Sequence, residues 1–293
     1  MRQVSIRMNE LERTRSANDP LIYNLTSKVP VVTVYFWIIK VLTTGMGEAA
    51  SDALVRAGGV VAVVATAVAL LASLVAQFKV SRYIPGVYWL AVVMVSVFGT
   101  MAADIPHFLG IPVWCTSLGY LLAVVVIFSM WHRAEGTLSF SAINTRRREA
   151  FYWAAVMATF ALGTAVGDLT AFSWGWGALA SGIIFAVLIA LPAMAHRWVG
   201  LNTVAAFWIA YILTRPLGAS FADWMGGPTR HGGLGWGMAL VAAVWSAAII
   251  AFVVYLAATR RDVRADARPR TEHVNSEQAA VKTGAGAAEP GND

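Results

Sequence analysis

FWIIKVLTTGMGEAASD, residues 36–52, is the first of four segments that align with one another without gaps. The others are YWLAVVMVSVFGTMAAD (88–104), YWAAVMATFALGTAVGD (152–168) and FWIAYILTRPLGASFAD (207–223). Each reads aromatic residue, Trp, nine residues, Gly, three residues, a small residue and then Asp. Four copies at one spacing indicate an internal repeat, and a repeat sets the architecture of the whole chain.

Three residue types recur at fixed positions of every copy. The tryptophans are Trp37, Trp89, Trp153 and Trp208; the glycines are Gly47, Gly99, Gly163 and Gly218; the aspartates are Asp52, Asp104, Asp168 and Asp223. In a helix that rises about 1.5 Å per residue, Trp and Asp are separated by about 22 Å. If these helices span a membrane, the tryptophans lie toward one face and the aspartates toward the other.

The composition indicates a membrane protein. Hydrophobic residues make up 58% of the 293 residues and charged residues only 13%, whereas about a quarter of a soluble domain is charged. The apolar stretches have the length of about 20 residues needed to cross a hydrocarbon layer about 30 Å thick. The net charge of +6 is typical of charges that orient a membrane protein, so no nucleic-acid partner is expected.

Each repeat predicts a motif helix followed by a plainer return helix. The expected pairs are about 31–53 with 59–77, 85–105 with 111–131, 150–171 with 176–194, and 202–223 with 234–257. The sequence therefore predicts an all-α membrane protein of eight transmembrane helices, arranged as four tandem, parallel helical-hairpin repeats. The repeats cover about 30–78, 82–132, 146–196 and 201–258, within a transmembrane domain of residues 30–258. Residues 1–29 form an N-terminal tail, and the polar residues 259–293 are expected to be disordered.

The basic residues predict the orientation. All but four of the 22 Lys and Arg lie in the two tails or in the connections between repeats. Arg56 and Arg230 lie on the opposite side, and Lys40 and Arg215 lie inside helices. Because cytoplasmic loops carry the excess of positive charge, both tails are expected to be cytoplasmic. The protein would then be a multi-pass protein of the cell inner membrane, with the four aspartates at the outer end.

The repeated residues each allow two interpretations. The tryptophans can anchor the inner membrane interface or pack inward against neighbouring repeats. Each glycine, followed four residues later by a small residue, favours close approach of two helices, although a functional hinge is the alternative. The four aspartates can cap helix ends and contact headgroups, or can form an acidic ring around a cation entrance.

Three ionisable residues break the internal repetition. Lys40, Glu48 and Arg215 fall on or near the same helical stripe as the glycines, so they should face the packed interior rather than lipid. Ionisable residues inside membrane spans indicate a functional site; the alternative is a structural ion pair between Glu48 and Arg215. Pro216 is expected to break or kink its helix and to free backbone carbonyls.

The repeats resemble a bacterial membrane-protein family of four tandem repeats of unknown function (the domain of unknown function 347 type), each with two transmembrane regions and a characteristic tryptophan. The resemblance is carried by KVPVVTVYFWIIKVLTTGMGEAASD, RRREAFYWAAVMATFALGTAVGDL and FWIAYILTRPLGASFADW, and it covers about residues 26–257. It implies the architecture of two-span repeats and brings no established activity with it.

The residues favour a small-solute or cation transporter or permease. Glu48 and the outer aspartates would bind cations or protons, and Lys40 and Arg215 would supply counter-charge. The alternative is a non-transporting scaffold or sensor whose charges only hold the bundle together. An enzyme is the least supported class, because no nucleophile–base pair, metal-ligand cluster or cofactor motif is found; His107 and His231 stand apart in the sequence. The expected partners are the lipid bilayer and an unidentified solute or cation, and an oligomer remains open.

Overall fold

The structure, a computed structural model, describes residues 27–263. Within them the chain forms helices and no strand, so the expected all-α class is confirmed. Residues 1–26 and most of the C-terminal tail, from residue 264, lie outside the described residues. The helices are α2 (Val34–Lys79), α3 (Pro85–Phe108), α4 (Val113–Glu135), α5 (Arg146–Asp168), α6 (Ala178–Leu188), α7 (Leu191–Trp198), α8 (Thr203–Gly226) and α9 (Met238–Thr259), with short turns η1 (Phe140–Ala142), η2 (Leu169–Ser173) and η3 (Thr229–His231).

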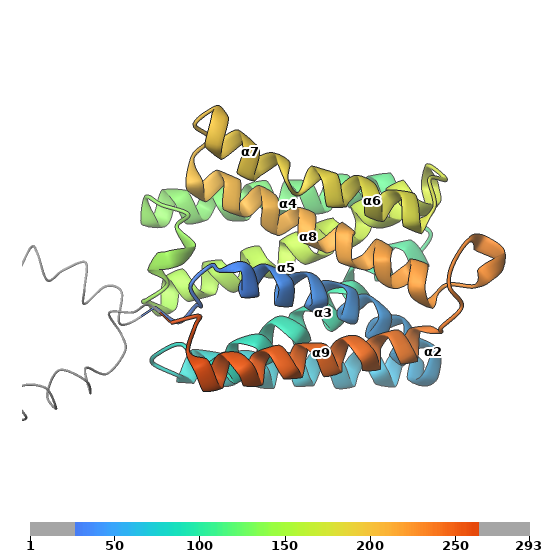
Figure 1. The fold of residues 1–293 in the computed structure, drawn as a ribbon, viewed down its shortest axis with the longest axis horizontal. Coiled ribbons are helices and arrows are strands. Elements are labelled where there is room, and N and C mark those ends of the chain that lie inside the picture. Colours follow the sequence, from blue (N-terminus) through green and yellow to red (C-terminus); the bar gives the residue numbers. More distant parts are fainter. Residues whose placement is uncertain (1–26, 264–293) are drawn as a thin grey trace, which may run out of the picture.

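Helix α2 is twice as long as a single membrane crossing requires. Its 46 residues would extend about 69 Å if straight, but the backbone leaves helical geometry at Gly59, with φ 50° and ψ −129°. Residues with a side chain rarely adopt this conformation. The chain turns back near this point, and residues 60–79 return beside α9 (Figure 1). With α2 counted once, the described residues contain seven helices long and apolar enough to cross a membrane.

Four motif helices form a closed ring at the centre of the bundle. They are residues 34–58 of α2, α3, α5 and α8, and each packs against the next and the last against the first. Ser96 of α3 donates a hydrogen bond to the Thr43 carbonyl of α2 (2.8 Å), and Thr44 of α2 donates to the Thr214 carbonyl of α8 (2.9 Å). Hydroxyl-to-carbonyl bonds of this kind hold helices together where lipid gives no hydrophobic force between them.

The return helices lie outside this ring, and each packs on the motif helix of the following repeat. α4 packs on α5 far more than on α3, and α6 packs on α8. Residues 60–79 of α2 reach α3, where the Thr66 hydroxyl lies 3.1 Å from the Met101 sulfur. α9 closes the circle on α2, with Trp245 against Gly45. The two helices of one repeat are therefore not a tightly packed hairpin, because neighbouring repeats interlock.

The outer surface of the bundle is apolar. Large aliphatic side chains such as Val125 on α4, Ile183 on α6 and Ile250 on α9 are more than half exposed. By contrast, α3 and α5 are mostly buried within the ring. Apolar helices that face outward in this way are typical of contact with lipid, and the protein is a polytopic, membrane-type helical protein.

Close approach of the motif helices predicts the effect of a methyl group at Gly218. A Cβ placed there would lie 2.7 Å from the Gly45 nitrogen and 2.9 Å from the Val41 oxygen, both backbone atoms that cannot rotate away. We expect Gly218→Ala to lower the free energy of unfolding by about 1–3 kcal/mol, as overpacking does. The measurement is reversible unfolding of the purified protein in mixed detergent micelles.

Gly119 on α4 provides the matched control. A Cβ there would meet nothing within 4 Å, so Gly119→Ala should leave the stability unchanged or raise it by up to about 1 kcal/mol. Equal losses in both variants would contradict the closed ring of motif helices.

Candidate functional site

Arg215 joins all four motif helices. It lies in α8, is 1% exposed, and its guanidinium donates to groups on the other three helices. Nη1 donates to the Thr44 carbonyl of α2 (2.8 Å), and Nη2 donates to the Glu48 carboxylate of α2 (2.8 Å). Nη2 also reaches the hydroxyls of Thr100 on α3 and of Thr164 on α5 (2.9 Å for Thr164). A planar, multidentate donor suits this role better than the single ammonium of lysine.

Glycine makes the space that Arg215 occupies. A Cβ on Gly163 of α5 would lie 2.5 Å from the Arg215 Cβ and 3.1 Å from the Pro216 ring. Helix α8 continues unbroken from Thr203 to Gly226, so the expected break at Pro216 is wrong. The proline ring is accommodated because Gly163 and Gly167 of α5 face it.

The other repeat glycines also stand where motif helices meet. A Cβ on Gly47 would clash with Ser96 of α3, and one on Gly99 would lie 3.4 Å from the Phe160 Cβ of α5. Gly218 lies against Gly45, as described above. Each of the four glycines therefore admits a neighbouring motif helix, which is the arrangement that the small-residue spacing favours.

Glu48 and Arg215 form a buried ion pair, with side chains 7% and 1% exposed. Removing two charges from water costs several kcal/mol per ion, and the mutual attraction offsets this only with good geometry and further hydrogen bonds. Here the Thr44 carbonyl and the Thr100 and Thr164 hydroxyls, which accept from the Arg215 guanidinium, supply those bonds. The pair is therefore stable as a unit, and loss of either partner would strand a buried charge.

Lys40 lies on α2 about two helical turns before Glu48, toward the end of the ring away from the aspartates. It is 1% exposed, and its Nζ has no hydrogen-bond partner among the described residues. The ammonium lies 3.7 Å from the centre of the Phe160 ring and 4.0 Å from that of Tyr211. Two aromatic faces stabilise a cation by a few kcal/mol at most, so this is an uncommon environment for a lysine.

The four repeat aspartates gather at the end of the ring nearest Glu48. Asp104, Asp168 and Asp223 each interact electrostatically with Glu48 and with Asp52. Asp52 forms an ion pair with Arg56 (2.8 Å), whose side chain is 70% exposed. Within residues 27–263 no group of three His, Cys, Asp or Glu could hold a metal ion. The four aspartates and Glu48 thus form an acidic rim at this end of the ring.

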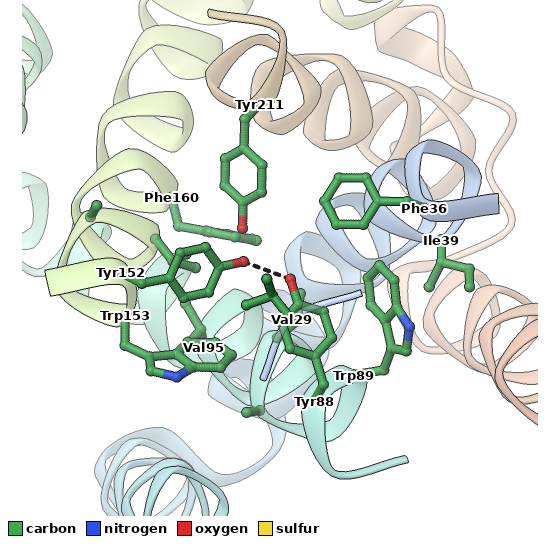
Figure 2. Packing of buried hydrophobic residues seen from close by; sticks show 14 of the residues in the cluster. Val29, Phe36, Ile39, Tyr88, Trp89, Val95, Tyr152, Trp153, Phe160 and Tyr211 are labelled. Carbon is green, nitrogen blue, oxygen red and sulfur yellow. Dashed lines mark hydrogen bonds between the residues drawn. The ribbon is translucent and has the colours of Figure 1, made fainter. Parts of the chain in front are cut away.

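At the opposite end, aromatic side chains fill the ring (Figure 2). Trp89, Trp153 and Trp208 are only 2%, 4% and 3% exposed, and each packs on other rings. Trp37 is partly buried against Phe207. An interfacial belt faces lipid headgroups, so the interpretation as a belt is wrong for these three; the tryptophans pack inward because neighbouring motif helices cover them.

A second buried ion pair lies at this aromatic end and was not foreseen from the sequence. The Lys28 Nζ lies 2.6 Å from the Glu149 carboxylate, with side chains 8% and 1% exposed. Gln77 donates to the other Glu149 oxygen (3.2 Å). The pair ties the segment before α2 to the first turn of α5. One signal was available: Glu149 lies three and four residues before Tyr152 and Trp153, on their buried helical face.

Asp262 lies beyond α9 at the same end. It is 1% exposed, accepts a short hydrogen bond from the Tyr83 hydroxyl, and its carbonyl accepts from Val31 N–H (2.9 Å). Burial raises the pKa of the Asp262 carboxyl and of the Tyr83 hydroxyl above their ordinary values. Both residues line a cavity of about 650 Å³, together with Arg82 and Arg260.

A known protein-family model matches each of the four repeats. The family described as Repeat of Unknown Function (DUF347) matches residues 35–83, 87–137, 151–201 and 206–262. The chain belongs to this family. The matched segments cover most of the chain, and the resemblance inferred from the sequence is confirmed. Searches of curated proteins and of solved structures find no match.

The buried pair gives a prediction of stability. Arg215→Met would leave Glu48 buried without its partner, and we expect a loss of about 3–5 kcal/mol in the free energy of unfolding. Arg230→Met, at an exposed position in η3, should change it by less than about 0.5 kcal/mol. The measurement is unfolding in detergent micelles.

A double variant separates a stranded charge from lost packing. Glu48→Leu combined with Arg215→Met removes both charges, so it should recover much of the stability lost by Arg215→Met alone. A double variant less stable than either single variant would show that the pair is not the coupled unit described here.

Proposed function

We propose that this DUF347 protein is a transporter for a small cation or small solute, with its path among the four motif helices. The observation that carries the proposal is the placement of Glu48 and Arg215 on the axis of the ring, beside the rim of four repeat aspartates. Acids that gather at one mouth raise the local concentration of cations. Ionisable side chains inside a membrane bundle most often belong to a solute or proton path.

The proposal includes eight membrane crossings. The two parts of α2, before and after Gly59, each have the length of one span, so α2 would cross twice. Both tails and the aromatic end would be cytoplasmic, because basic residues gather at that end. They lie at helix ends or in the adjoining connections: Lys79, Arg82, Arg133, Arg146–Arg148, Arg197 and Arg260. The four aspartates would then open outward from the inner membrane.

Cysteine labelling tests this topology. In a Cys115→Ala background, Ala57→Cys should react with a membrane-impermeant maleimide added outside intact cells, because α2 would turn at the outer surface. Ser81→Cys, in the connection between α2 and α3, should react only after the membrane is opened. Eight crossings in this orientation would be contradicted if, in intact cells, the external maleimide labelled Ser81→Cys and did not label Ala57→Cys.

A cation enters at the rim of aspartates and reaches the Glu48 carboxylate, where it competes with the Arg215 guanidinium. Release of Arg215 from Glu48 leaves the arginine held by the Thr44 carbonyl and the Thr100 and Thr164 hydroxyls. Farther in, Lys40 supplies a positive charge that opposes free passage of cations, so transport requires rearrangement of the aromatic end.

Neutralising Glu48 tests the proposal directly. In proteoliposomes screened for uptake of protons, monovalent and divalent metal cations and small metabolites, Glu48→Gln should abolish the ion-dependent flux. Asp168→Asn should reduce the flux without abolishing it. This change removes one acid of the rim but keeps the Glu48–Arg215 pair. Glu135→Gln, whose carboxylate pairs with Arg148 (2.8 Å), should transport normally. Unchanged flux in Glu48→Gln would sink the role given to that residue.

One observation favours the non-transporting alternative, a membrane scaffold or sensor. The Arg215 guanidinium is held by four acceptors, as expected of a charge cluster that only stabilises the helix bundle. The two functions differ in a single measurement. If the wild-type protein moves none of the screened solutes while Glu48→Gln lowers stability, the charge cluster is structural and the scaffold stands.

A further inference from the structure

A series of tyrosine hydroxyls extends from the aromatic end toward Lys40. Tyr88 of α3 and Tyr152 of α5 are fully buried and share a hydrogen bond of 2.6 Å (Figure 2). The buried Tyr211 of α8 points its hydroxyl toward Tyr152 (Figure 2), and this hydroxyl has no hydrogen-bond partner among the described residues. The ring of Tyr211 then contacts the Lys40 ammonium. A hydroxyl can accept a proton on one side and release its own on the other.

The end of this series farthest from Lys40 reaches Asp262. The Tyr83 ring lies 5.7 Å from the Tyr88 ring, centre to centre, and Tyr83 interacts electrostatically with Tyr152. Its hydroxyl donates to Asp262, which lines the cavity of about 650 Å³. The second oxygen of the Asp262 carboxylate is buried and has no partner among the described residues. An acid in this position can receive a proton from water in the cavity.

These polar groups are departures from the repeat. The aromatic position before each repeat tryptophan holds Tyr88 and Tyr152 in the second and third copies, but phenylalanine in the first and fourth. The position three residues after the tryptophan holds Lys40 and Tyr211 in the first and fourth copies, but valine in the others. Packing alone would be served by phenylalanine before each tryptophan and by an apolar side chain such as valine three residues after it. Instead, each copy contributes one polar group to the same column.

We propose that Asp262, Tyr83, Tyr88, Tyr152 and Tyr211 form a proton relay that loads Lys40 from the aromatic end of the bundle. This rests on the proposed transport function and names its coupling ion. Water in the cavity gives a proton to Asp262. Each hydroxyl then accepts a proton from the group before it and passes its own onward. Among the described residues no hydrogen bond joins Tyr83 to Tyr88 or Tyr211 to Lys40, so a water molecule bridges each of these two steps. At the last step the neutral Lys40 amine becomes an ammonium. No bond between heavy atoms forms or breaks.

The charge state of Lys40 then controls the rest of the path. The titratable and charged groups that act on it both lie in α8: the Tyr211 ring faces its ammonium, and Arg215 interacts with it electrostatically. From α5 the Phe160 ring contacts it. α9 also packs on α2, but its Tyr255 faces Tyr35 instead. A protonated Lys40 repels both Arg215 and any cation held at Glu48, whereas a neutral Lys40 does not. The cation and the proton would therefore move in opposite directions across the membrane.

The test removes one hydroxyl from the middle of the relay. The full chain is reconstituted into liposomes that contain a pH-sensitive dye, and a potassium diffusion potential drives protons inward. Relative to the wild type, Tyr152→Phe and Lys40→Met should each lower the rate of proton flux at least tenfold. Tyr88→Phe removes the other hydroxyl of the Tyr88–Tyr152 hydrogen bond, and it should lower the rate of proton flux to the same extent as Tyr152→Phe. All variants are compared at equal amounts of monodisperse protein.

Tyr255→Phe is the matched control. Tyr255 and Tyr35 also form a hydroxyl pair (3.5 Å), but this pair contacts Arg261 at the surface and does not touch Lys40. Its proton flux should equal that of the wild type. Proton flux in the wild type no greater than in protein-free liposomes, or flux unchanged in Tyr152→Phe, overturns the relay.

The relay and the transport function fail in different ways. Cation uptake that depends on Glu48 without any accompanying proton flux overturns the relay and leaves the transporter in place. Proton flux that depends on Tyr152, with no flux of any screened cation or metabolite, supports the relay and removes the proposed cation path.

Discussion

A single guanidinium in a water-poor interior is the constraint on which the rest of this structure depends. The Arg215 guanidinium needs several acceptors, because a buried charge without partners costs several kcal/mol. Those acceptors come from the other three motif helices. The helices must therefore meet around one axis, at distances that only glycine permits. The repeat glycines, the hydroxyl residues and the closed ring are all consistent with this requirement.

Interlocking of the repeats follows from the same geometry. A motif helix that turns its small-residue face to the axis has its opposite face free, and the return helix of the preceding repeat covers it. Since the last return helix packs on the first motif helix, the arrangement closes without an unpaired repeat. Such closure gives the bundle a continuous lipid-facing surface, while its polar groups are kept inside.

The interior contains three layers of different chemistry along one axis. The acidic rim and the Glu48–Arg215 pair lie at one end, Lys40 between aromatic faces lies in the middle, and hydrogen-bonded tyrosines lie at the other end. The layers arise from substitutions in individual copies, because an exact fourfold repeat would place four like charges or four like rings at each level. Divergence of the copies therefore makes a polar column chemically possible.

The sequence by itself determined the repeat, the helical class, the position of most helices and the inward placement of Lys40, Glu48 and Arg215, because spacing along a helix fixes which residues share a face. The pairing of Glu48 with Arg215 could be suggested for the same reason. Only the tertiary structure decided that the motif helices close into a ring, that each return helix serves the next repeat, and that the tryptophans are buried. It also revealed Lys28 with Glu149, and Tyr83 with Asp262. These contacts join residues far apart in the chain, and periodicity carries no information about which helix faces which.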